Sequence, residues 1–331
     1  MGIMANKLMT LHDAVEQYTW DGMMYAHGAG ISVGSDTIAF GREMVRQGRK
    51  HLHMITHCCT QQLNLLCAAG AVDKLETAFT GLEVYGFPNG LRRAVETGKI
   101  IIEDYSNLSL GLRLLAGSMN WPFCPTISGY GSDVEWRSGF KPDEYPCTTK
   151  IPEVTDPFTG KTAHVLSPLR PEMSALHVTM ADIQGNAIML GTEWCRPELA
   201  RGSGKVVLQA DHIVDTDCMR QFPNLVRIPE FLVDAVVYSP MGVWPHCSTG
   251  LYDSDEEHFY YMNACMKTDE GYKEYKEKYI DSYKTNDEYL KMMGEERIKK
   301  ITATATAHLM DPYRKWILSD DQIKELMKEG R

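Results

Sequence analysis

The sequence has no apolar run near the ~20 residues that a membrane-spanning helix requires. It also has no long run of Lys or Arg, and 44 acidic residues outnumber 34 basic ones, which gives a net charge of −10. Nucleic acid and membrane surfaces are therefore not expected as partners. Residues 1–7 lack the basic and apolar regions of a signal peptide. We expect a soluble, cytoplasmic protein.

Composition also excludes collagen-like, low-complexity and disulfide-rich proteins. Gly (27) and Pro (15) are ordinary in number for 331 residues. The nine cysteines include the adjacent pair Cys58 and Cys59 and do not resemble the framework of a small secreted protein. We expect reduced thiols. A hydrophobic content of 44% is enough for a full core.

Residues 10–127 alternate between helix-like and strand-like segments. Thr10 and Asp13 resemble a helix-capping pair, and the apolar residues that follow repeat at helical spacing. The expected strands are 23–27, 52–56, 75–80, 99–104 and 123–127, and the expected helices are 11–18, 37–47, 61–69, 90–97 and 108–117. Strands that alternate with short helices indicate βαβ units. The predicted fold class is α/β, with an open, mostly parallel sheet and helices on both faces.

A proline-rich segment, 141–171, interrupts this alternation. Its Asp156–Gly160 stretch is a good turn sequence, so we expect an inserted surface hairpin there. Further strands are expected at 175–180, 187–190, 206–209 and 233–238. We therefore divide the chain into an α/β domain, 1–252, and a helical C-terminal extension, 253–331. The extension carries a stripe of tyrosines, which favours a packing or subunit face over a ligand site: Tyr272, Tyr275, Tyr279, Tyr283 and Tyr289.

Ligands of open α/β sheets bind outside the carboxyl ends of the strands, where the N-termini of helices converge. This rule selects five loops of the sequence as the place to look for function: 27–36, 57–60, 81–83, 106–107 and 128–133.

The first of these loops is rich in glycine. Its Gly28, Gly30 and Gly34 have the spacing GxGxxxG rather than the GxGxxG of dinucleotide sites, and no acidic residue clearly ends the next strand. We favour a loop whose bare backbone lets an acyl group approach and whose N–H groups bind an oxyanion. His27, beside the loop, is either functional or structural.

The second loop contains His57, Cys58 and Cys59. Adjacent cysteines cannot easily both bind one tetrahedral ion, and no CxxC pair accompanies them, so no metal site is expected. A Cys/His nucleophile and ordinary buried residues both stay open for this loop.

Several segments together resemble the α (A) subunits of the family I CoA-transferases. Because their common order extends over about 240 residues, the resemblance is specific. The segments are Met9–Val15 with Arg46–Gly48, then Asp156–Gly160, His177, Ala181–Asp182 and Gly185–Asn186, and finally Val233–Val237, Pro240, Gly242, Pro245 and Gly250–Asp253. The sequence departs from the family pattern at Ala29, Gly30 and Asp36, which replace a Gly, a Phe and a Pro.

The resemblance implies the CoA-transferase (NagB-like) fold and a CoA thioester as substrate, with no permanently bound cofactor. It also implies that the nucleophilic glutamate belongs to a β subunit, so that the enzyme is a hetero-oligomer acting on acyl-CoA and carboxylic acids. In this chain only Glu96-Thr97-Gly98 fits the short Glu-x-Gly motif, at the end of an expected helix. No catalytic residue is therefore expected here.

The residues expected to contact substrate come from two of the five loops: His27, Gly28, Ala29, Gly30, Gly34, Ser128 and Ser132. Two alternatives remain open at this point. The same architecture serves CoA-thioester and ring-opening hydrolases of the superfamily, and a non-enzymatic relative is the third possibility.

Overall fold

The computed structural model describes residues 6–28, 34–129, 131–147 and 149–329. Its strands are β1 (Leu8–Met9), β2 (Met24–His27), β3 (Leu52–Cys58), β4 (Val72–Phe79), β5 (Ile101–Asp104), β6 (Cys124–Thr126), β7 (Glu153–Thr155), β8 (Thr162–Leu166), β9 (Met173–Ala181), β10 (Ala187–Ile188), β11 (Lys205–Ile213), β12 (Val226–Ile228) and β13 (Ala235–Tyr238).

The α-helices are α1 (Leu11–Tyr18), α2 (Ile38–Arg46), α3 (Gln61–Ala68), α4 (Asn89–Glu96), α5 (Asn107–Ser118), α6 (Asp133–Trp136), α7 (Arg196–Gly202), α8 (Thr216–Gln221), α9 (Glu256–Cys265), α10 (Asp269–Tyr279), α11 (Asn286–Met293), α12 (Glu295–Ile301) and α13 (Asp320–Glu329). No helix in the described ranges is long and apolar enough to cross a membrane.

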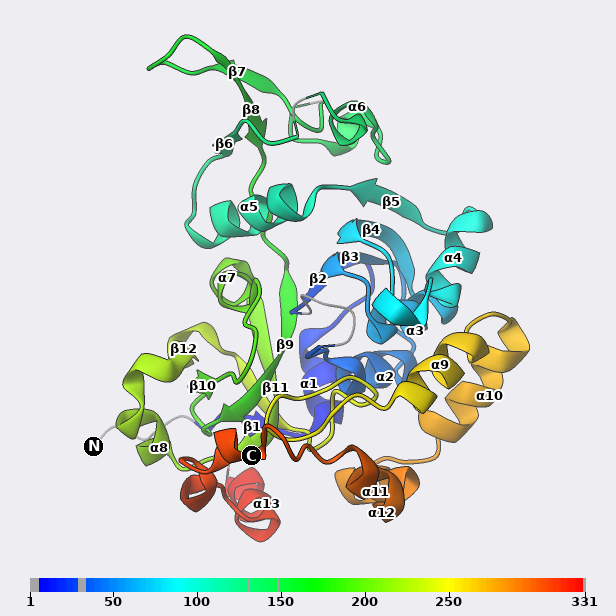
Figure 1. Ribbon diagram of the computed structural model, residues 1–331, viewed down its shortest axis with the longest axis vertical. Coiled ribbons are helices and arrows are strands. Elements are labelled where there is room, and N and C mark those ends of the chain that lie inside the picture. Colours follow the sequence, from blue (N-terminus) through cyan, green and yellow to red (C-terminus); the bar gives the residue numbers. More distant parts are fainter. Residues whose placement is uncertain (1–5, 29–33, 130, 148, 330–331) are drawn as a thin grey trace.

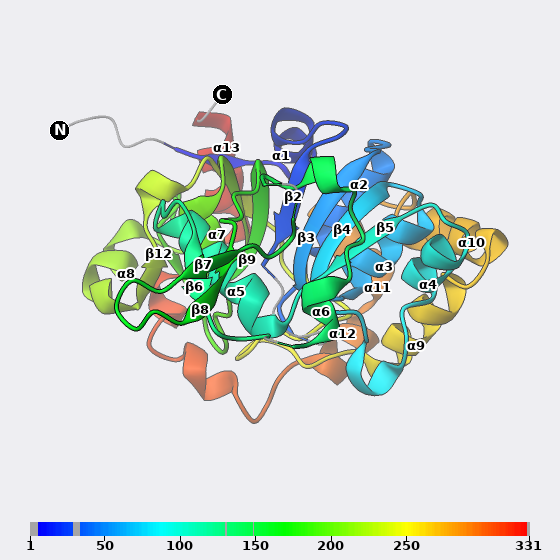
Figure 2. The same cartoon turned by 90° about the horizontal axis from the view of Figure 1, so that it is seen from above.

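The central sheet is mostly parallel, as predicted. Its strand order is β1-β13-β11-β9-β2-β3-β4-β5, and β10 and β12 add antiparallel pairs beside β9. Because neighbouring residues of a strand face opposite sides, Tyr25 of β2 joins the core under α1 to α4, whereas Ala26 joins the core under α5, α7 and α13. Helices therefore cover both faces of the sheet (Figures 1 and 2).

The expectation that residues 123–127 continue the parallel sheet is wrong. β6 pairs with β8 in a separate three-stranded antiparallel sheet, β6-β8-β7, which projects beyond α5 in Figure 1. A short apolar strand carries no information about which sheet it joins, and the pairing of Cys124 with Leu166 depends on residues far along the chain. The projecting unit thus begins before residue 141 and includes the hairpin of β7 and β8.

The tyrosine stripe of the C-terminal extension packs within this chain. Tyr275, Tyr279, Tyr283 and Tyr289 are buried. The fully buried Arg42 of α2 donates hydrogen bonds to the hydroxyls of Tyr275 and Tyr289, both at 3.3 Å. The interpretation as a packing face is therefore correct, and these contacts fasten the extension to α2.

Two glycines of α5 predict opposite responses to substitution by alanine. A Cβ at Gly117 would lie 2.0 Å from the carbonyl oxygen of Leu169, whereas a Cβ at Gly111 would meet nothing within 4 Å. We expect Gly117→Ala to lower the free energy of unfolding by about 2 kcal/mol through overpacking. Gly111→Ala should raise it by about 0.5 kcal/mol, because alanine favours the helix. Urea denaturation of both variants tests this, and equal effects would contradict the close approach.

Candidate functional site

The connections of the sheet reverse direction between β2 and β9. From β2 the strand order proceeds through β3 and β4 to β5, and from β9 it proceeds through β11 to β13 on the other side. β2 and β9 are parallel neighbours, with His27 opposite Ala175 at the carboxyl end of β2. Such a topological switch point is where open α/β sheets bind ligands. The predicted loop after β2 therefore begins at the expected place.

Gly28, the first residue of that loop, is required by a close contact. A Cβ on Gly28 would lie 2.4 Å from Cγ of Arg196, which begins α7. The Gly28 N–H donates to the carbonyl of Ala175 at 3.3 Å, so it extends the sheet and is already used. Any backbone N–H offered to a substrate comes from elsewhere in the loop. The candidate residues Ala29 and Gly30 lie outside the described residues.

Arg196 holds the segments around Gly28 together through backbone carbonyls. It is 1% exposed, and it donates to the carbonyls of His177 at 2.7 Å and Glu193 at 3.0 Å. Burial away from water lowers the pKa of Arg196 to about 10, which still leaves it charged at neutral pH. The positively charged side chain of Arg196 therefore packs against Gly28, on the side to which a Cβ would point.

A buried carboxylate closes the base of the glycine loop. Asp36 lies two residues after Gly34, and its Oδ1 is 3.3 Å from Nδ1 of His27, the residue just before Gly28. The other oxygen, Oδ2, is 3.2 Å from Nε2 of His246. All three side chains have an exposure of 0%. The contact between Asp36 and His27 therefore joins the two ends of the loop, and His246 fixes Asp36 from a distant segment of the chain.

Backbone groups complete the surroundings of Asp36. The N–H of Thr37 donates to Oδ1 at 2.7 Å, and the N–H of Gln62, in the first turn of α3, donates to Oδ2 at 3.2 Å. Burial opposes ionisation of Asp36, but the contacts with His27 and His246 outweigh it and lower its pKa to about 2. Asp36 is therefore a buried anion held by four nitrogen atoms.

His246 is neutral in this arrangement. Burial lowers its pKa to about 4, even though the charge of Asp36 opposes that shift. Nε2 of His246 lies 3.2 Å from Asp36 and 3.3 Å from the N–H of Gln61. Because an ionised carboxylate is the stronger acceptor, we assign the Nε2 proton to the contact with Asp36.

The lowered pKa of His246 predicts how stability depends on pH. Between pH ~6.5 and about 4 the unfolded chain binds a proton at this residue that the folded chain does not, so the free energy of unfolding falls as the pH falls. We expect His246 to contribute about 2 kcal/mol of this decrease. In His246→Gln that part of the pH dependence should disappear. Chemical denaturation at pH 4.5 and 7 measures it, and an unchanged pH dependence in the variant would rule out a neutral buried His246.

The loop after β3 also lies at the switch point. His57 lines a small cavity together with His27, Gly28 and Cys195. Its Nε2 lies 3.1 Å from the carbonyl oxygen of Asn107, and its ring is 5.9 Å from that of Trp194. Trp194 has a φ of +50°, a left-handed conformation that is strained for a bulky residue and recurs at functional sites.

The cysteines of this loop are poor nucleophiles. Burial raises the pKa of Cys58 to about 12 and raises that of Cys59 well above its usual value. Both therefore remain thiols at neutral pH, whereas the thiolate is the reactive form. The interpretation as ordinary buried residues fits these two side chains better than a Cys/His nucleophile. No group of three His, Cys, Asp or Glu side chains suited to a metal ion occurs within the described ranges.

Ser128 and Ser132 follow a strand that does not belong to the central sheet. Both follow β6 in the projecting unit, and their hydrogen bonds stay local: the N–H of Ser128 donates to Thr126, and the Ser132 hydroxyl donates to the carbonyl of Gly129. They were selected because β6 was expected in the parallel sheet. That premise is wrong, so their assignment as substrate contacts stays a prediction without this support.

A second buried carboxylate, Asp211, lies on β11 near the switch point. It accepts hydrogen bonds from the hydroxyls of Ser248 at 2.7 Å and Tyr252 at 3.0 Å, and it lies 2.7 Å from Nε2 of His177. Sequence reasoning did not select Asp211, Arg196 or His246 as site residues. Asp211 could have been selected from the sequence, because it lies two residues after the expected strand 206–209, where ligand-binding residues of α/β sheets occur.

Comparison with known proteins places this chain in a family. The family described as "Coenzyme A transferase" matches residues 8–239, so the chain belongs to it. The predicted resemblance is thereby confirmed.

Three curated relatives are similar over most of this chain. An uncharacterized protein of Archaeoglobus fulgidus is 36% identical over 90% of the chain, which spans 65% of that protein's length. The A subunit of glutaconate CoA-transferase from Acidaminococcus fermentans is 26% identical over 88% of this chain and 93% of that protein. The cholesterol ring-cleaving hydrolase IpdA subunit of Mycobacterium tuberculosis is 25% identical, covering 84% and 94%.

The fold also matches a solved structure. The crystal structure of glutaconate CoA-transferase from Acidaminococcus fermentans superposes with a TM-score of 0.85 at 22% identity, covering 96% of this chain and 99% of that chain. The α/β fold with its C-terminal helices is therefore that of the CoA-transferases.

Proposed function

We propose that this chain is the α subunit of a CoA-transferase, which moves CoA between an acyl-CoA and a carboxylic acid with a β subunit that supplies the nucleophilic glutamate. The assignment of the nucleophilic glutamate to another subunit is supported by the position of the only Glu-x-Gly motif in this sequence. Glu96 ends α4, directly before β5, and forms an ion pair with Arg92 on the same helix. It therefore lies at the amino end of the sheet, opposite the switch point.

The proposed reaction begins when the glutamate supplied by the β subunit makes a nucleophilic attack on the thioester. The C–S bond breaks, CoA leaves as a thiolate, and an acyl-glutamyl anhydride forms. The thiolate then attacks the glutamyl carbonyl, which releases the first carboxylate and leaves a glutamyl-CoA thioester. The acceptor carboxylate reverses these steps and leaves as the new acyl-CoA. Water must be excluded throughout, because hydrolysis of either intermediate would release free CoA or free acid, and the free energy of the thioester would be lost.

We propose that this chain forms one wall of the closed site. The loop that starts at Gly28 would face the acyl group, and its backbone N–H groups beyond Gly28 would stabilise an oxyanion. His27, Asp36 and His246 would act as positioning residues, because they join the two ends of that loop and do not reach solvent. His57 and Trp194 would border the same space from β3 and from the segment before α7.

The ring-cleaving relative favours one alternative, a CoA-thioester or ring-opening hydrolase. Product analysis separates the two functions. The chain would be co-expressed with its candidate β subunit and given glutaryl-CoA as donor, with and without acetate as acceptor. Formation of acetyl-CoA that depends on acetate supports the transferase. Free CoA released equally in both reactions would support the hydrolase.

The cytoplasm is the proposed location. The support is that none of the nine cysteines, all within the described residues, forms a disulfide, as expected in a reducing compartment.

A further inference from the structure

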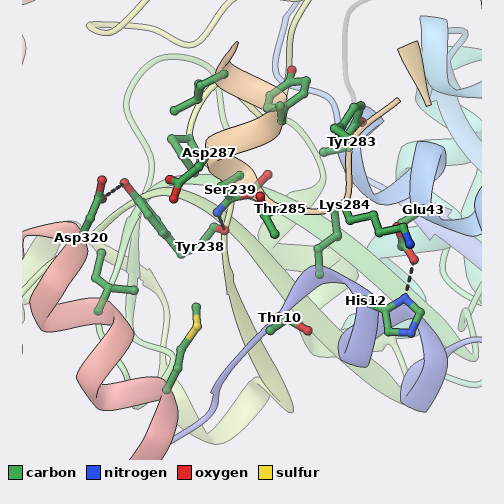
Figure 3. A pocket seen from close by; sticks show the side chains of 18 of the residues that line it. Thr10, His12, Glu43, Tyr238, Ser239, Tyr283, Lys284, Thr285, Asp287 and Asp320 are labelled. Carbon is green, nitrogen blue, oxygen red and sulfur yellow. Dashed lines mark hydrogen bonds and ion pairs between the residues drawn. The ribbon is translucent and has the colours of Figure 1, made fainter. Parts of the chain in front are cut away.

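A pocket of about 450 Å³ lies where the C-terminal extension meets the α/β domain. We call it the seam pocket. Residues from the N-terminus of α1, from α2, from the end of β13 and from α11 and α13 line it, and Figure 3 shows them converging on one space. Its volume is within the usual range for small-molecule sites.

The seam pocket is separate from the switch-point site. It lies at the carboxyl ends of β1 and β13, where Thr10 and Tyr238 follow the paired residues Met9 and Val237. Two strands, β11 and β9, stand between β13 and β2 in the sheet. None of the residues placed at the switch-point site lines the seam pocket.

The acidic side chains of the seam pocket are already paired. Glu43 forms ion pairs with Arg46 and with His12, the latter at 2.9 Å. Asp287 lies 3.4 Å from the ammonium of Lys324, and Asp320 accepts a hydrogen bond from the Tyr238 hydroxyl at 2.8 Å. Arg46 and Lys324 thus balance the charges of Glu43 and Asp287, whereas Asp320 is held by a neutral hydroxyl.

Hydrogen-bond donors remain available. Ser239 is 3% exposed and lines the pocket, and its hydroxyl has no hydrogen-bond partner among the described residues. The hydroxyl oxygens of Thr10 and Thr285 accept from backbone N–H groups, so each hydroxyl keeps a proton to donate. The side-chain ammonium of Lys284, which is labelled beside the pocket in Figure 3, forms no ion pair within 4 Å in the described part of the chain, and the backbone N–H of Lys284 donates to Glu288 at 2.7 Å.

The rest of the lining is mostly apolar. The rings of Tyr238, Tyr283 and Tyr289 and the side chains of Leu290, Ile323 and Met327 provide it. Unused donors beside aromatic and aliphatic side chains suit a ligand with a carboxylate at one end and a flat apolar body at the other.

We propose that the seam pocket binds a small aromatic carboxylic acid, with the carboxylate toward Lys284 and Ser239 and the ring among the three tyrosines. Because the pocket is built from both the domain and its extension, a bound acid would stabilise their contact. This inference does not rest on the proposed transferase activity, and its test measures binding alone.

The test compares phenylacetate with phenylacetamide, which has the same shape but no charge. Saturation-transfer NMR and isothermal titration calorimetry on the full chain measure both. We expect phenylacetate to bind about tenfold more tightly than the amide, as for a charge-assisted contact with donors. Lys284→Met should remove most of this preference, whereas the exposed lysine of the control variant Lys299→Met lies outside the pocket lining and should leave it intact.

A second variant, Ser239→Ala, removes the unpartnered hydroxyl with little change in volume and should weaken phenylacetate by about fivefold. Three results would overturn the proposal: no detectable binding of phenylacetate, equal binding of acid and amide, or the same preference in Lys284→Met as in the unchanged chain.

Discussion

Asp36→Asn should lower kcat/KM of the assembled enzyme about 100-fold. The contact between Asp36 and His27 joins the two ends of the glycine loop, and a shift of these ends by a fraction of an ångström would misplace the loop's backbone N–H groups relative to the substrate. The same variant should lower the free energy of unfolding by about 2 kcal/mol, as when a buried hydrogen-bond donor loses its acceptor. Asn places an NH2 group where one carboxylate oxygen now accepts from Thr37, Gln62 or a histidine. The four nitrogen donors can then no longer all be satisfied.

A matched control for this variant is available at the surface. Asp73 lies 2.9 Å from His51, but both side chains are more than half exposed. Asp73→Asn should change stability by less than about 0.5 kcal/mol and leave activity unchanged. Steady-state kinetics and urea denaturation of both variants provide the comparison. If Asp36→Asn lost stability but kept its kcat/KM, the cluster would be structural only and the positioning role would fail.

Gly28→Ala should also be strongly damaging. The new methyl group would lie 2.4 Å from Cγ of Arg196 and 2.9 Å from Cδ2 of Leu176, so α7 or the loop must move. We expect a loss of about 2 kcal/mol from overpacking. We also expect a fall in kcat of about 100-fold, because the displaced loop would no longer place its backbone N–H groups correctly for the reaction.

Gly111→Ala serves as the control for Gly28→Ala, because it adds the same methyl group in open space on α5. Its kinetic constants should match those of the unchanged enzyme. A Gly28→Ala enzyme with normal kcat would show that the close contact with Arg196 does not determine the geometry of the site.

Much of the α/β core was predictable because local signals decide it. The helical spacing after Thr10 lies within a segment that the structure confirms as α1, and Thr10 does cap α1 through the N–H of Asp13. The helix expected at 90–97 is α4, Asn89–Glu96. β3 extends two residues beyond the predicted strand, and β4 begins three residues before the predicted strand and ends one residue before it. β6 failed because its sequence is strand-like, whereas its choice of sheet depends on residues some forty positions later.

The candidate site was predictable only in part, for the same reason. His27 and Gly28 follow directly from a strand and a glycine loop, and both lie at the switch point. Asp36 was noticed as a departure from the family pattern, but its role depends on His246, which is about 210 residues away along the chain. Contacts of that kind arise from the tertiary fold and leave no periodic signal in the sequence.

In the proposed mechanism the reacting carboxylate belongs to a second polypeptide. Mass spectrometry of the assembled enzyme, incubated with acyl-CoA and digested after acid quenching, tests it directly, because the glutamyl-CoA thioester adds the mass of CoA to one peptide. We predict that mass on a glutamate of the β subunit, with no such mass on any peptide of this chain. A CoA adduct on a carboxylate of this chain, or acyl transfer by this chain alone, would show that this chain carries the nucleophile itself.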